Sequence, residues 1–91
     1  MTQKELSDLL AMNDLDRRLR QVMASVFNVD AARLTDADSS KTIPEWDSVN
    51  HMHLILSLEA EFGIQFDAGE IAELVNVGLI RQRIAQGTVR G

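Results

Sequence analysis

The sequence predicts a small all-α protein with three main helices and one short helix. Its 91 residues provide a single hydrophobic core, because two cores of half that size would each bury too little surface to be stable. Apolar residues recur at intervals of three and four over two long segments, which is the spacing of one buried helix face. No segment alternates apolar and polar residues over any length, so no strand is expected.

The first main helix is expected from about Asp14 to Asn28. Asn13 or Asp14 can cap its start by accepting free amide protons of the first turn. The N-terminal extension, residues 1–12, fits either a short extra helix or a frayed extension of the main one. The expected buried stripe of the main helix consists of Leu15, Leu19, Val22, Met23, Val26 and Phe27.

A long polar connection follows, from Asn28 to Glu45, with Val29 and Leu34 as its expected anchors. Pro44 disfavours helical backbone at the residue before it, so no helix is expected to run through this segment. An ordered loop of this length is unusual in a small domain and often has a function.

The second main helix is expected from about Ser48 to Glu61. Asp47 or Ser48 stands at its N-terminus, and Gly63 provides the C-terminal stop because glycine tolerates a positive φ. The expected buried stripe consists of Val49, Met52, Ile55, Leu58 and Phe62.

Two further helices are expected near the C-terminus. Asp67 can cap a short helix that runs through Ile71 and Leu74, and Asn76 can cap the last one. The inward face of the last helix is expected to consist of Val77, Leu79, Ile80 and Ile84. The resulting domain organisation is an extension over residues 1–12, one compact domain over residues 13–88 and a tail over residues 89–91.

The composition excludes several functions. The net charge is −5, and nine acids but only one base, Lys41, lie between Thr35 and Leu74. This balance argues against sequence-independent binding to nucleic acid or anionic membranes. It fits either a partner that docks electrostatically on the acidic segment or a merely solvated acidic surface.

The chain has no cysteine, so disulfides and thiol nucleophiles of the polypeptide are excluded. Without a long apolar run no membrane span or signal peptide is expected, and the cytoplasm is the expected compartment.

No catalytic or metal site emerges from the motifs. His51 and His53 would point about 200° apart on a helix, so they cannot bind one metal together, and both are expected at the surface. The segment from Asp36 to Asp47 has some oxygen ligands of a calcium loop, but Lys41 occupies the position where the sharp turn needs glycine. No glycine-rich loop follows a strand, so a nucleotide cradle is also absent from the pattern.

Ser48 is the residue whose position carries most functional information. A serine between a loop and a helix is most often a plain N-cap. The alternative is a hydroxyl that carries a phosphate-linked group, because a helix N-terminus offers free amide protons and a partial positive charge.

The stretch Glu45-Trp46-Asp47-Ser48-Val49 is followed by a helix from Asn50 to Phe62 and then by Gly63-Ile64-Gln65-Phe66. This arrangement resembles the core of an acyl carrier protein, and the resemblance covers about Leu15 to Ala85. That family marks its phosphopantetheine-bearing serine with Asp-Ser-Leu, and Asp47-Ser48-Val49 is a conservative variant of this motif. Other matching segments follow in the family's order, namely Phe27-Asn28-Val29, Leu34-Thr35, Glu59-Ala60-Glu61-Phe62-Gly63-Ile64 and Val75-Asn76-Val77-Gly78-Leu79-Ile80.

The resemblance implies a carrier rather than an enzyme, with the fold of a small acyl-carrier-like four-helix bundle. A phosphopantetheinyl transferase would move a 4′-phosphopantetheine arm from coenzyme A onto Ser48, and the arm's thiol would hold acyl groups as thioesters. Further partners would be an acyl-loading ligase or acyltransferase and downstream acyl-processing enzymes. Nothing in the sequence specifies an oligomer, so a monomer is expected. Partner recognition is expected at Asp47, Val49, Leu54, Leu56, Glu59 and Glu61; of Leu54 and Leu56, one is expected to stay exposed.

Departures from the family pattern bear on the pathway. Asn50 and His53 stand where the carriers of fatty-acid synthesis have acids, which weakens electrostatic matching to basic enzyme surfaces. A specialised lipid, polyketide or secondary-metabolite pathway is therefore expected.

An aminoacyl or peptidyl carrier is an alternative function, although Ile43-Pro44-Glu45-Trp46 lacks a glycine-rich approach to the serine. An unmodified helical interaction module is a second alternative. Trp46 either anchors the loop against the bundle or belongs to the docking surface.

Overall fold

The computed structural model describes residues 2–89, apart from the side chains of residues 4–13 and 87–89. Its elements are α1 (Gln3–Phe27), the 3-10 helix η1 (Ala31–Arg33), α2 (Ser48–Phe62), α3 (Ala68–Glu73) and α4 (Val77–Val89). The described chain forms no strand, and its one β-type contact is an isolated bridge between Ser39 and Asn76. These elements confirm the all-α prediction of three main helices and one short helix.

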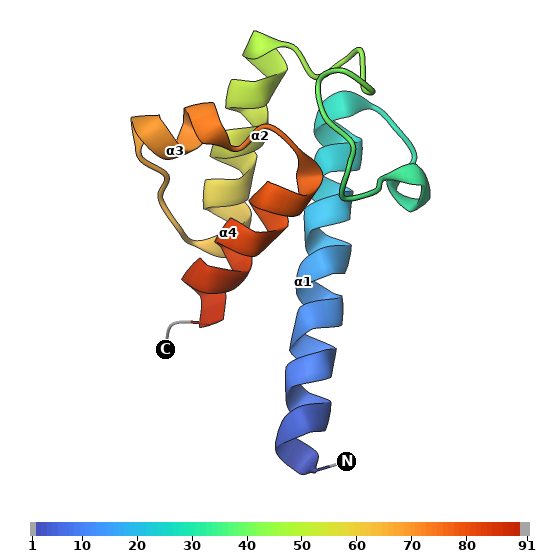
Figure 1. Cartoon of the computed structure of the whole chain (residues 1–91), viewed down its shortest axis with the longest axis vertical. Coiled ribbons are helices and arrows are strands. Elements are labelled where there is room, and N and C mark those ends of the chain that lie inside the picture. Colours follow the sequence, from blue (N-terminus) through green and yellow to red (C-terminus); the bar gives the residue numbers. More distant parts are fainter. Residues whose placement is uncertain (1, 90–91) are drawn as a thin grey trace.

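Helix α1 is longer than the periodicity predicted. It begins at Gln3 instead of Asp14, and its N-terminal half extends beyond the other helices (Figure 1). Neither glycine nor proline interrupts this segment, and Asp14 lies inside the helix, where its carboxylate pairs with Arg17 and Arg18 three and four residues later. The predicted cap at Asn13 or Asp14 is therefore wrong. At the other end of the chain, Val89 still belongs to α4, and residues 90–91 of the predicted tail lie outside the described residues.

The core lies between α1, α2, α4 and the long loop. Two of the predicted burials on α2 are wrong, because Val49 is 65% exposed and Met52 is 44% exposed. Leu79 on α4 is also 40% exposed. Both helices carry apolar residues on more than one face. The face that packs against α1 includes Leu54 on α2 and Ile80 on α4, and these two residues are buried. The buried residues are Leu19, Met23, Phe27, Leu34, Ile43, Trp46, Leu54, Ile55, Leu58, Phe66, Leu74, Val77, Ile80 and Ile84.

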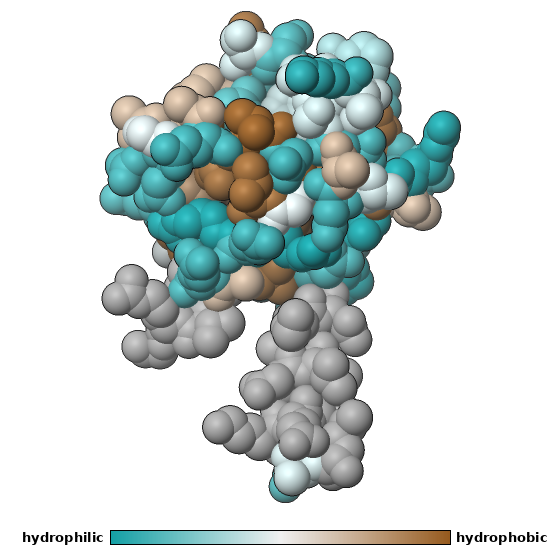
Figure 2. Space-filling model, in the orientation of Figure 1, coloured by the Kyte–Doolittle hydropathy of each residue, from teal (hydrophilic) through white to brown (hydrophobic). Residues whose placement is uncertain are grey.

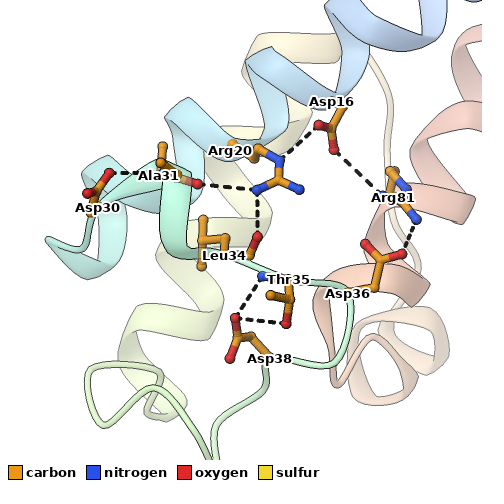
Figure 3. Close-up of polar contacts among 10 residues, drawn as sticks. Asp16, Arg20, Asp30, Ala31, Leu34, Thr35, Asp36, Asp38 and Arg81 are labelled. Atoms are coloured by element: carbon orange, nitrogen blue, oxygen red, sulfur yellow. Dashed lines mark hydrogen bonds and ion pairs between the residues drawn. The ribbon is translucent and has the colours of Figure 1, made fainter.

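An arginine of α1 fixes the first part of the long loop to the bundle (Figure 3). The Arg20 guanidinium donates to the carbonyls of Ala31 and Leu34, while its Nε donates to Asp16 at 2.8 Å. Asp16 in turn lies 3.7 Å from Arg81 of α4. Charged groups thus join α1, the long loop and α4. The expected anchor Leu34 is buried in the core.

Hydrogen bonds hold the next turn of the loop. The Asp38 carboxylate accepts the backbone N–H of Thr35 at 2.8 Å and the hydroxyl of Thr42 at 2.8 Å (Figure 3 shows the Thr35 contacts). These bonds lower the pKa of Asp38, with the Thr35 N–H as the largest cause, followed by the Thr42 hydroxyl. The carbonyl of Asp38 also accepts the N–H of Val77, which ties the loop to the start of α4.

Candidate functional site

Ser48 is the first residue of α2, and its neighbour Asp47 caps the helix. The Asp47 backbone is extended, and its carboxylate accepts the N–H of Asn50 at 2.8 Å. Ser48 is exposed, and its hydroxyl has no hydrogen-bond partner among the described residues. The reading of Ser48 as a plain N-cap is therefore wrong. Since the neighbouring aspartate performs the capping, the serine hydroxyl is left free at the surface.

The loop segment before Ser48 is held on both sides. The amide of the Asn50 side chain donates to the carbonyl of Glu45 at 2.8 Å. The N–H of Trp46 closes a turn by donating to the carbonyl of Ile43 at 3.0 Å. A backbone fixed in this way presents the Ser48 hydroxyl in a defined position, as expected of a site rather than of a flexible connection.

Trp46 anchors this segment to the core. Its side chain is 4% exposed and stacks on Phe27 of α1, with ring centroids 4.9 Å apart. The indole N–H donates to Nδ1 of His51 at 2.9 Å, so the buried indole is fully satisfied. Of the two roles considered for Trp46, anchoring the loop is confirmed.

His51 bridges the loop, α2 and α3. Its Nδ1 faces the indole N–H of Trp46, which can only donate, and its Nε2 lies 2.9 Å from the carbonyl of Ile71, which can only accept. The network therefore assigns the neutral tautomer with the proton on Nε2. The expectation that His51 is a surface residue is wrong, because the ring is half-buried between two helices; His53 is exposed as expected.

An open groove of about 590 Å³ runs along this site between α2 and α3. Ser48 and His51 line it, and most of its other lining residues are apolar. In Figure 2 the most extended apolar area of the visible face lies near the connection from α3 to α4, and hydrophilic residues surround most of it. The complete lining is Ser40, Trp46, Asp47, Ser48, His51, Met52, Ala68, Ile71, Ala72 and Val75.

The structure separates the two leucines of the predicted recognition set. Leu56 is 59% exposed, together with its α2 neighbour Val49 and the cap residue Asp47. Leu54 is fully buried, so the prediction that it belongs to a recognition surface is wrong. Its side chain belongs to the core because it lies on the stripe of α2 that faces α1.

The two glutamates of the set make contacts within the chain. The Glu59 carboxylate accepts the N–H of Phe66 at 2.9 Å, which fixes the connection from α2 to α3. Glu61 pairs with Arg18 of α1 at 2.9 Å. Both residues thus help to hold the bundle together, and their part in partner recognition stays a prediction.

The link between Trp46 and His51 was missed by the sequence analysis. A signal for it was available, because the N–H of a buried tryptophan must find an acceptor and a histidine follows Trp46 by five residues.

Within the described residues no group of three or more His, Cys, Asp or Glu side chains could hold a metal ion. None of the helices described is both long and apolar enough to cross a bilayer.

Fold and site together define a small helical bundle in which the exposed Ser48 hydroxyl lies at the start of α2, beside a mainly apolar groove. The chain is 36% identical over 61 residues to the acyl carrier protein of Helicobacter pylori strain G27, a match that covers 66% of this chain and 77% of that protein. The acyl carrier protein of strain HPAG1 matches to the same extent. The solution structure of holo acyl carrier protein from Geobacter metallireducens is similar, with a TM-score of 0.74 and 38% identity, over 84% of this chain and 86% of the other. No protein-family model matches the chain. The chain belongs to the acyl carrier protein family.

Proposed function

We propose that this protein carries acyl intermediates as thioesters on a 4′-phosphopantetheine arm attached to Ser48. The observation that carries the proposal is the exposed Ser48 hydroxyl, which is unpartnered among the described residues because Asp47 caps α2. Family membership supports it, since a structural relative of this chain is described as a holo acyl carrier protein.

The start of α2 suits an attached phosphodiester. The backbone N–H groups of Ser48 and Val49 have no acceptor among the described residues, since the Asp47 carboxylate takes that of Asn50. Free amides and the positive end of a 15-residue helix favour a phosphate group there. When bound, the arm supplies the terminal thiol that this cysteine-free chain lacks. The residues of the chain attach the arm and position it, and partner enzymes perform the chemistry on the cargo.

We place the partners in a specialised lipid, polyketide or secondary-metabolite pathway. Residues 48–58 of α2 contain no acid, so the helix beside the attachment site offers little charge to a basic enzyme surface. Instead Val49, Met52 and Leu56 are exposed at spacings that place them along one face. A phosphopantetheinyl transferase, an acyl-loading ligase or acyltransferase and downstream acyl-processing enzymes would meet this apolar face. Asp47, Glu59 and Glu61 are the proposed charged contacts beside it.

Intact mass measures the central step directly. The purified protein is incubated with coenzyme A and, separately, with a broad-specificity and a cognate phosphopantetheinyl transferase. We expect a gain of one phosphopantetheine on the wild type and none on Ser48→Ala. Ser40→Ala is the matched control, because this serine lines the same groove and should leave the gain intact. If neither transferase modifies the wild type, the carrier proposal fails and an unmodified interaction module takes its place.

A further inference from the structure

The His51 side chain stands between the attachment site and the interior of the bundle. Residues three apart on a helix share a face, so His51 lies on the same side of α2 as Ser48, one turn further along. From there its ring reaches across to α3, where Nε2 donates to the carbonyl of Ile71 at 2.9 Å. The gap between the two helices is thus crossed by a hydrogen-bonded ring next to the attachment site.

The space behind this ring is filled. The Trp46 indole is bonded to the inner side of the bridge through His51 Nδ1 and stacks on Phe27. Leu54 and Ile55 follow on α2 with at most 1% of their surface exposed. A chain that entered the core between α2 and α3 would have to break both imidazole hydrogen bonds and displace the stacked indole.

The space in front of the bridge is open. The groove of about 590 Å³ begins at Ser48 and continues between α2 and α3. On the α3 side its wall includes Ala68 and Ala72, whose small side chains leave room, and Met52 and Val75 contribute exposed apolar surface. A volume of this size is typical of a site for a small-molecule group, and its lining suits a short aliphatic segment.

We propose that Trp46 and His51 act as specificity-determining residues that close the interior and keep the arm-bound acyl group in the groove between α2 and α3. The inference rests on the proposed attachment of the arm to Ser48. It limits the acyl groups that the protein itself shelters to short ones, because the groove is open to solvent and gives a long alkyl chain no enclosed space. Longer chains project into water or onto the next enzyme.

Acyl groups of increasing length test this placement. A phosphopantetheinyl transferase loads Ser48 with the acetyl, hexanoyl or dodecanoyl arm: the Ser48 oxygen forms a phosphodiester with the arm, the pyrophosphate bond of the acyl coenzyme A breaks, and adenosine 3′,5′-bisphosphate leaves. Intact mass records the loading. Methyl resonances of Leu54 and Ile55 report on the interior, and those of Met52 and Val75 report on the groove. We expect the groove methyls to shift in every loaded form and the interior methyls to stay in place, with an unfolding temperature that does not rise with chain length. Interior shifts that grow with chain length, together with a rising unfolding temperature, overturn the inference.

Two histidine variants test the part played by the bridge. His51→Ala removes the bridging ring, and we expect the dodecanoyl form of this variant to shift the Ile55 methyl and to gain thermal stability over its acetyl form. His53→Ala, on the same helix but exposed, should behave like the wild type. If His51→Ala also keeps the interior methyls unchanged, His51 does not close the interior. Absence of any mass gain on the wild type overturns the proposed function itself, whereas a mass gain with interior shifts overturns the groove placement alone.

Discussion

Replacing Asp47 with alanine removes the side chain that caps α2 and should destabilise the bundle by about 1 kcal/mol. The carboxylate accepts the N–H of Asn50 at 2.8 Å, and loss of an N-cap costs roughly 0.5–2 kcal/mol. Because Asp47 is exposed, water replaces part of the lost bond, which places the expected cost near the middle of that range. Ser48→Ala removes an exposed hydroxyl without a described partner, so its cost should stay below about 0.5 kcal/mol.

Urea unfolding of the unmodified protein, followed by circular dichroism, measures both variants. A loss of about 1 kcal/mol corresponds to a decrease of roughly 4–8 °C in Tm for a domain of this size. Asp47→Asn is the control, because asparagine caps a helix about as well as aspartate, and it should restore most of the stability. The reasoning is refuted if Ser48→Ala destabilises the protein as much as Asp47→Ala, since Ser48 would then be the capping residue.

Three further changes probe the loop and the helix ends. Arg20→Met should lower the free energy of unfolding in urea by about 2 kcal/mol, because two loop carbonyls lose the partly buried guanidinium that donates to them. The control Arg17→Met removes an exposed ion pair and should cost less than about 0.5 kcal/mol. Equal losses in the two variants would contradict the role of Arg20 in holding the loop. Gly63→Ala should cost about 1 kcal/mol in the same assay, because φ is 64° in the left-handed region although the space around the glycine is open; a neutral result would show that the backbone is unstrained. Asp38→Asn should make the free energy of unfolding fall less steeply as the pH is lowered into the acid range. The bond from the Thr35 N–H lowers the pKa of Asp38, so the native state is favoured above the ordinary carboxyl pKa and loses this advantage as the pH falls through the native value. An unchanged acid limb in urea titrations at several pH values would count against this contribution.

Local signals predicted α2 well because they lie within the chain segment itself. Its start at Ser48 follows an aspartate that can cap, and its end at Phe62 precedes Gly63, whose αL backbone closes the helix as predicted. The start of α1 was missed because Asp14 has the chemistry of a cap and also that of an internal ion-pair partner. Only the continuation of the helix to Gln3 distinguishes these roles.

Burial on α2 depended on contacts that periodicity does not contain. Val49 and Met52 have helical spacing with Ile55, yet the neighbouring stripe with Leu54 faces α1. His51 was misplaced for a similar reason. Its burial depends on an indole N–H on one side and on the Ile71 carbonyl on the other, and the second partner is twenty residues away in the sequence. The position of Ser48, by contrast, followed from the motif, and the structure added that its hydroxyl is not used for capping.

The stacking of Trp46 also gives the protein an intrinsic optical label. Trp46 is the only tryptophan in the chain, and it precedes Ser48 by two residues. Its ring stacks on Phe27 on one side, and the His51 ring lies with its centroid 6.1 Å away. Fluorescence of the indole therefore comes from a single, well-defined environment that borders both the groove and the core. Events at the attachment site can be followed in real time by emission intensity and quenching, at low concentration and in the native chain, with no dye and no engineered residue.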